Sequence, residues 1–468
     1  MRRVIEMARI VVIGGGLIGL AAATMVAKLG HDVTVLERDP APPPDRPQQA
    51  WDRWERQGVM QFRQPHYLLP AGQRMLGEQL PEVAGALESA GAVAHDMLSP
   101  LPPGITDRAP RPGDEKFLTR TARRPVLEHA MAKTAERYAE IRRGARVTGL
   151  LTTGARQVTG VVLHDRAELH ADLVIDAMGR ASPLPVWLEA AGLQEVDERA
   201  EFAGFAYYSR LFRARPGEDP PLTGTLSCTP FDCYSILTIP SDAGTWAVTI
   251  AIHSSDRALR KLREERHWTR LAEACPLHAH LVAGGEPVTG VLAASGGNRI
   301  RAVVRAGVPA ATGVLSVGDA WACTGPSLGR GVTLGLMHAA VVAEAVADHV
   351  KDPFTLAIEC DRLTRQRLLP WYRNTVYLEN QRAAQIAAVI EGRSPQEPDP
   401  AGAPLTDLLA AMTWDADVFR AYLEMVAMLA PPQEIMSRPG LADKISGGRR
   451  DPWRAPGPSR GELLKMLG

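Results

Sequence analysis

Residues 9–19 read RIVVIGGGLIG, a short β-branched run followed by a glycine-rich turn. Residues 9–13 are continuously apolar, which is typical of a parallel strand buried on both faces. The turn matches G-x-G-x-x-G, residues 17–29 predict a helix, and DVTVL at residues 32–36 predicts a second strand. A strand, this turn, a helix and another strand form the βαβ unit that binds dinucleotides.

The residue types in this unit suit a dinucleotide. Gly14 permits the tight turn, Gly16 lets the backbone approach a pyrophosphate, and Gly19 lets helix and strand pack closely. The helix N-terminus attracts the phosphates, and Glu37 at the end of the second strand can accept hydrogen bonds from a ribose. The alternative is a glycine-rich turn that binds nothing. The candidate cofactor-binding residues here are Gly14, Gly15, Gly16, Leu17, Ile18, Gly19, Glu37 and Arg38.

The strand pattern changes along the chain. DLVIDA at residues 172–177 and residues 314–317 again predict buried parallel strands, whereas residues 205–212, 234–239 and 246–252 predict longer antiparallel strands. Because parallel strands precede and follow the antiparallel block, a nucleotide-binding domain is interrupted by a second domain.

Composition excludes several classes of protein. The 468 residues are 45% hydrophobic and 23% charged, with a formal net charge of +0, so no bulk field recruits nucleic acid or an acidic membrane. The five Cys are too scattered for a disulfide framework, which predicts a cytoplasmic protein. No metal site and no integral membrane segment are predicted either. Arg outnumbers Lys by 46 to 7, which indicates a GC-rich bacterial genome.

Three segments together resemble a known family. The N-terminal turn, DLVIDAMGRAS at residues 172–182 and LSVGDAWACTGPSLGRG at residues 315–331 are similar to FAD-dependent oxidoreductases with the p-hydroxybenzoate hydroxylase fold. The resemblance covers residues 8–350 and implies FAD in the N-terminal site. It also implies that Asp319 binds the flavin ribitol, that the loop with Pro326 and Gly329 lies at the flavin ring, and that Arg124 faces the cofactor. The further candidates are Gly318, Arg330 and Gly331.

The predicted fold class is therefore α/β, with an FAD-binding Rossmann-like parallel sheet interrupted by an antiparallel-sheet substrate domain. The FAD-binding domain comprises residues 1–85, 115–195 and 295–350, and the substrate domain comprises residues 86–114 and 196–294. Residues 351–468 form a helical C-terminal extension, with an irregular tail after Pro431.

Other segments refine the resemblance. Met178 stands where aromatic hydroxylases of the family carry the acidic residue that contacts flavin and nicotinamide, so the chain looks closer to the flavin epoxidase and prenyl reductase branches. QFRQPH at residues 61–66 resembles a flavin-proximal epoxidase segment, which makes His66 the candidate acid/base; a structural histidine is the alternative. Trp51 and Trp54 do not complete the W-x-W-x-I-P motif of halogenases.

The predicted function is monooxygenation of a small apolar molecule by epoxidation or hydroxylation, through a flavin C4a-hydroperoxide, in specialised metabolism. A dehydrogenase or double-bond reductase is one alternative, and a flavin-free binding or escort protein is another. NAD(P)H or a separate flavin reductase supplies the electrons. Helices after Phe354 would exclude water from the site. The candidate substrate-cavity residues, for which core packing is the alternative, are Tyr207, Tyr208, Tyr234 and Trp246.

Overall fold

The computed structural model describes residues 7–154, 156–201, 204–222, 227–393, 403–447 and 454–468. Its N-terminal part confirms the predicted βαβ unit, formed by β1 (Arg9–Ile13), α1 (Leu17–Ala27) and β2 (Asp32–Glu37). The parallel sheet has the strand order β20-β9-β1-β2-β5. The three further strands are β5 (Glu140–Arg143), β9 (Leu173–Asp176) and β20 (Val314–Ser316).

Both faces of this sheet are buried, which explains why its strands are apolar without alternation. Val12 and its neighbours on one face pack against α1 and a layer of helices, and Val11 on the other face packs against a three-stranded sheet and a short helix. The first layer contains α3 (Pro70–Gln79), α4 (Pro81–Ser89), α5 (Arg124–Ala135) and α9 (Gly331–His349). The opposite layer contains β6 (Val147–Thr153), β7 (Gln157–Leu163), β8 (Glu168–His170) and α6 (Leu184–Ala190).

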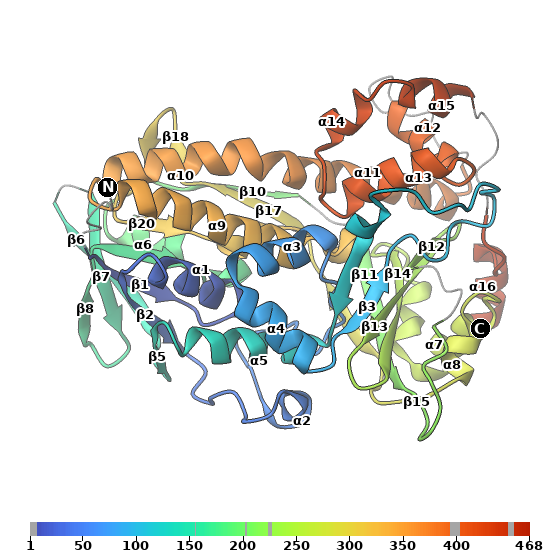
Figure 1. Ribbon diagram of the computed structural model, residues 1–468, viewed down its shortest axis with the longest axis horizontal. Coiled ribbons are helices and arrows are strands. Elements are labelled where there is room, and N and C mark those ends of the chain that lie inside the picture. Colours follow the sequence, from blue (N-terminus) through green and yellow to red (C-terminus); the bar gives the residue numbers. More distant parts are fainter. Residues whose placement is uncertain (1–6, 155, 202–203, 223–226, 394–402, 448–453) are drawn as a thin grey trace.

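The predicted antiparallel sheet is also present, on the right in Figure 1. Its strands follow the order β12-β13-β14-β11-β15, with β16 also paired to β11. They are β11 (Phe205–Arg213), β12 (Cys228–Pro230), β13 (Tyr234–Ser241), β14 (Thr245–His253), β15 (Glu286–Pro287) and β16 (Leu292–Ser295). One face packs against α7 (Glu265–Glu273), α8 (Ala279–Ala283) and α16 (Arg460–Leu467).

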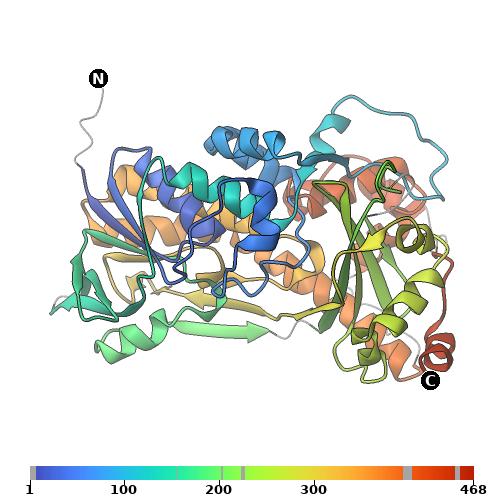
Figure 2. The same cartoon turned by 90° about the horizontal axis from the view of Figure 1, so that it is seen from below.

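Short strands connect the two sheets. β10 (Asp197–Glu201) pairs with β17 (Asn298–Ala302), which pairs with β21 (Ala322–Cys323), and Figure 2 shows this ribbon running between the two parts. β3 (Val93–Asp96) pairs with β4 (Leu118–Thr121) across one of the predicted domain boundaries. The remaining short elements are α2 (Ala50–Arg53), β18 (Val304–Arg305), β19 (Val308–Pro309) and the 3-10 turns Pro47–Gln49, Asp114–Phe117, Gly179–Ala181, Leu259–Arg263, Gly318–Ala320 and Pro326–Leu328.

The C-terminal extension is helical, as predicted, but the prediction of an irregular tail after Pro431 is wrong. Its helices are α10 (Pro353–Arg367), α11 (Leu369–Ile390), α12 (Ala403–Ala411), α13 (Ala416–Val426), α14 (Pro432–Met436), α15 (Leu441–Gly447) and α16. Ser459 and Glu462 form a capping box that starts α16. Tertiary packing stabilises such short helices, and α16 contributes Leu463 and Leu467 to the core beneath the antiparallel sheet.

Helix α9 is long and apolar enough to cross a membrane by length and composition. It nevertheless lies in the interior, where it packs against α1, α3 and α10. Its apolar character is therefore explained by burial in the core.

Candidate functional site

The turn between β1 and α1 has the shape that a dinucleotide requires. Gly14 has φ +105°, and a Cβ there would lie 2.6 Å from the carbonyl oxygen of Ala177. At Gly16 a Cβ would meet none of the described atoms within 4 Å, so this backbone faces open space. No described side chain caps α1, and its first turn carries no acidic residue. The exposed N–H groups can therefore receive a pyrophosphate.

The carboxylate of Glu37 stabilises this turn through hydrogen bonds within the protein. Its carboxylate accepts hydrogen bonds from the N–H groups of Gly15 (3.0 Å) and Asp39 (2.9 Å) and from the guanidinium of Arg56 (2.8 Å). Glu37 thus holds the glycine turn in place, and its contact with a ribose stays a prediction. The neighbouring Arg38 is exposed beside the turn.

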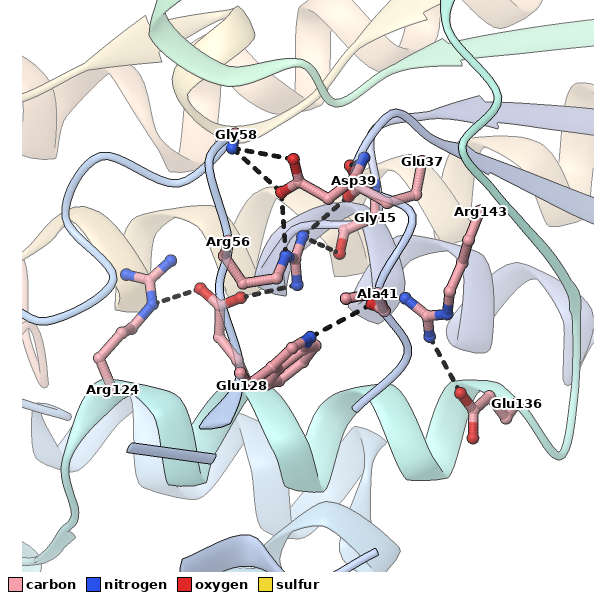
Figure 3. A network of polar contacts seen from close by, with 11 residues as sticks. Gly15, Glu37, Asp39, Ala41, Arg56, Gly58, Arg124, Glu128, Glu136 and Arg143 are labelled. Carbon is pink, nitrogen blue, oxygen red and sulfur yellow. Dashed lines mark hydrogen bonds and ion pairs between the residues drawn. The ribbon is translucent and has the colours of Figure 1, made fainter. Parts of the chain in front are cut away.

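Arg56, which is not among the residues predicted for the site, connects three carboxylates (Figure 3). Besides Glu37, its guanidinium donates to Asp39 (3.3 Å), Glu128 (3.2 Å) and the carbonyl oxygen of Gly15 (3.0 Å). The side chain of Arg56 is 1% exposed. It comes from a loop 19 residues beyond Glu37, and the sequence contains no spacing rule that would have revealed this contact.

Arg124 is the first residue of α5, and it lies in the site as the resemblance implied. Its Nε donates to Glu128 (2.7 Å), one turn along the same helix, and its Nη1 donates to Nε2 of His66 (2.8 Å). The Nδ1 of His66 in turn donates to the carbonyl oxygen of Gln64 (2.8 Å). Arg124 is therefore held from two sides, and its charge acts on Asp319.

These contacts argue against acid/base chemistry at His66. Burial and the charge of Arg124 lower the pKa of His66 to about 3, so the ring is neutral at physiological pH. Both ring nitrogens already make hydrogen bonds. The geometry assigns His66 to positioning Arg124, in agreement with the structural alternative.

We expect His66 to remain neutral from pH 8 down to pH 5, because protonation would place a second positive charge beside Arg124 in a buried site. Nitrogen-15 NMR of histidine-labelled protein measures this directly, and His66→Asn identifies the signal by its loss. A titration midpoint between pH 5.5 and 7.5 for that signal would contradict this assignment.

Asp319 lies in the 3-10 turn that follows β20, next to Gly318 with φ +61°. Burial raises the pKa of Asp319, whereas the charges of Arg124, Arg180 and Arg299 lower it. Asp319 as a whole residue is half-buried, and its carboxyl lies among these three arginines. This is a suitable place for a ligand hydroxyl, as the resemblance implied for the ribitol.

The loop of residues 325–330 leads into α9. Gly329 has φ +64°, and α9 starts at Gly331 without a capping side chain among the described residues. A Cβ on Gly335 of α9 would lie 2.6 Å from Ile18 of α1, so the first turn of α1 packs against the second turn of α9. Pro326 and Gly329 lie in the loop just before α9, and the position of this loop at a flavin ring stays a prediction.

Arg330 does not point into this site. Its guanidinium is buried and donates to Asn374 (2.9 Å) and Thr375 (3.0 Å) of α11 and to the carbonyl oxygen of Met425 (2.7 Å). Only its backbone borders the start of α9. The predicted cofactor contact is corrected to an anchor between the loop and the C-terminal extension.

The predicted substrate residues divide between the two faces of the antiparallel sheet, because side chains alternate along each strand. Tyr208, Tyr234 and Trp246 lie on the face covered by α7, α8 and α16; Trp246 donates to the carbonyl oxygen of Leu281 (3.1 Å). These three are core residues, so their assignment to a substrate cavity is wrong. Tyr207 lies on the other face, beside Ser327 of the loop.

That second face, which we call the inner face, combines apolar and hydroxyl groups. Leu237, Ser209 and Thr249 lie on it in register, and the Ser209 and Thr249 hydroxyls are 2.9 Å apart. Ile386 of α11 packs at the Tyr207 end, and Trp51 packs at the opposite end. The loop of residues 325–330 reaches the inner face where Tyr207 lies beside Ser327.

Comparisons with known proteins agree with this arrangement. Residues 9–58 match the family described as pyridine nucleotide-disulphide oxidoreductase. Protein Rv3254 of Mycobacterium tuberculosis is 27% identical over an alignment of length 396, which covers 78% of this chain and 79% of that protein.

Solved structures are similar over most of the chain. PqsL, a probable FAD-dependent monooxygenase from Pseudomonas aeruginosa, aligns with a TM-score of 0.62 at 16% identity, covering 82% of this chain and 100% of PqsL. The anhydrotetracycline hydroxylase OxyS from Streptomyces rimosus aligns with a TM-score of 0.57 at 18% identity, covering 91% of this chain and 76% of OxyS. At these identities the likeness concerns the fold, and the predicted fold is confirmed.

Proposed function

We propose that this chain, whose fold is that of the FAD-dependent monooxygenases, binds FAD and transfers one oxygen atom from dioxygen to a small apolar molecule. The observation that carries the proposal is the contact between the first turn of α1 and the second turn of α9, with open space at Gly16. Two uncapped helix N-termini at one place suit a ligand that is anionic both at a pyrophosphate and, when reduced, at its ring. The fold shared with PqsL and OxyS supports an oxygenating reaction.

The residues present fit FAD. The N–H groups at Gly16 and in the first turn of α1 would hold the pyrophosphate, and Asp319 would accept hydrogen bonds from the ribitol. The start of α9 at Gly331 would stabilise negative charge on the ring. Bound flavin supplies the redox chemistry, whereas the protein orients it and excludes water.

The largely apolar side chains of the inner face support an apolar substrate. Leu237 and Ala251 lie on this face, and the buried Ser209 and Thr249 hydroxyls bond to each other. Helix α11 covers one end of this face, which supports the proposed role of the C-terminal helices in excluding water.

The electron donor belongs to the same proposal. Met178 follows β9, and its N–H donates to the buried carboxyl of Asp176 (3.0 Å). An apolar side chain at this position supports slow direct reduction by NAD(P)H, or delivery of reduced flavin by a separate reductase. The finer placement near the epoxidase and prenyl reductase branches stays a prediction.

The reaction class is testable without a known substrate. FAD-loaded protein is reduced with dithionite and mixed with dioxygen in the presence of a panel of aromatic and alkene compounds, and product masses are measured. We expect a gain of one oxygen atom, because a water-excluding site delivers oxygen to the substrate in place of releasing peroxide. A gain of two hydrogens from the reduced flavin would establish the reductase alternative, and a loss of two hydrogens with oxidised FAD and an artificial acceptor would establish the dehydrogenase alternative. Protein that binds no FAD would support the escort alternative.

A further inference from the structure

A buried carboxylate from the C-terminal extension contacts the loop of residues 325–330. Glu379 of α11 is 2% exposed. It accepts hydrogen bonds from the Ser327 hydroxyl and from Nδ2 of Asn298 (2.6 Å). Oδ1 of the same Asn298 accepts from the N–H of Gly325 (2.7 Å). Glu379 and Asn298 therefore hold the first part of the loop by hydrogen bonds to Ser327 and Gly325.

The fit between Glu379 and the loop is close. A Cβ on Gly325 would lie 2.5 Å from Oε1 and 2.7 Å from Oε2 of Glu379, so the backbone must pass directly against the carboxyl. Burial raises the pKa of Glu379, whereas its hydrogen bonds with Ser327 and Asn298 and the charge of Arg330 lower it. Removing the carboxyl would leave buried donors without their acceptor.

The other end of the loop is attached to the same helix. Arg330 donates to Asn374 and Thr375, one turn before Glu379 on α11. No described side chain caps the start of α9 at Gly331. Helix α11 thus holds the loop at both ends and leaves the N–H groups at the start of α9 open.

We infer that Glu379 is a positioning residue of the flavin site, which holds the loop of residues 325–330 so that the start of α9 meets the flavin ring. The inference rests on the proposed function. It gives the C-terminal extension a part in cofactor binding besides covering the inner face. Glu379 acts through Ser327 and Gly325, and it needs no contact with the flavin itself.

The test measures FAD affinity of the full-length apoprotein by quenching of flavin fluorescence. We expect Glu379→Ala to raise the Kd by about 10-fold, the size of one lost charge-assisted hydrogen bond. Glu379→Gln should remain within about 3-fold, because the amide keeps the shape and part of the bonding. The matched control is Glu424→Gln: Glu424 is also buried, but it pairs with Lys116 and Arg438 away from the loop.

A second readout separates positioning from general stability. The visible absorption bands of bound FAD should change in Glu379→Ala and not in Glu424→Gln, because only the first variant alters the surroundings of the ring. Ser327→Ala removes one contact without emptying the core, and it should raise the Kd by about 3-fold. Wild-type Kd and spectrum in Ser327→Ala and Glu379→Ala would overturn the inference. Absence of FAD binding by the wild-type chain would instead overturn the proposed function.

Discussion

Replacing Arg56 with Met should lower the free energy of unfolding by about 3–5 kcal/mol, the cost of leaving buried charges without their partner. The Arg56 guanidinium is shared by Glu37, Asp39 and Glu128, whose side chains are 6%, 8% and 0% exposed. Because Met fills a similar volume, the lost free energy of unfolding reflects the missing charge and hydrogen bonds, whereas no cavity forms. Urea unfolding at neutral pH, followed by circular dichroism, measures the effect.

Two further variants make this experiment specific. Arg142→Met removes an exposed ion pair with Glu140 and should cost less than about 1 kcal/mol. Adding Asp39→Asn to Arg56→Met should recover part of the loss, because the described ion pair of Asp39 is with Arg56, whereas Glu128 keeps its pair with Arg124. If Arg56→Met unfolds within about 1 kcal/mol of the wild type, the network does not have the energetic role assigned to it.

Replacing Asp319 with Ala should weaken FAD binding by about 10- to 100-fold, the range expected for losing hydrogen bonds to a charged acceptor. The fold should survive, because Asp319 is a half-buried residue in a short turn and the loss of its small carboxyl leaves little empty volume. Flavin fluorescence titration gives the Kd, and circular dichroism checks the fold. Asp172→Ala, which changes a surface pair with Arg9, is the matched control.

The pH dependence of the same titration gives an independent check. Burial raises the pKa of Asp319, so the carboxylate takes up a proton at a higher pH than an exposed aspartate does. FAD affinity that depends on the carboxylate is present above this pKa and is lost as the pH falls through it. The wild-type Kd should rise on acidification more steeply than the Kd of Asp319→Ala. Full flavin occupancy in the variant, or parallel pH curves, would contradict the role.

The amino-acid sequence alone was sufficient for the parts of this protein that depend on local pattern. Continuous apolar runs predicted the parallel strands, and longer strand-like runs predicted β11, β13 and β14. Gly14, Gly16 and Gly19 predicted the dinucleotide turn, since few other residues fit its backbone. The capping box at Ser459 was an available signal for α16 that the prediction of an irregular tail overlooked.

Only the tertiary structure decided which side chains meet across long sequence distances. Arg56 reaches Glu37 and Glu128, and Glu379 reaches Ser327, although no periodic pattern relates these positions. Strand alternation predicts that Tyr207 and Tyr208 lie on opposite faces of the sheet. It does not predict which of the two faces packs against α16 and which one lies toward the loop. Ion pairs and core contacts depend on how distant elements pack together, whereas the glycine turn depends on the backbone conformation of its own residues. Local sequence patterns therefore determined the dinucleotide-binding fold, whereas tertiary packing determined which side chains surround the site.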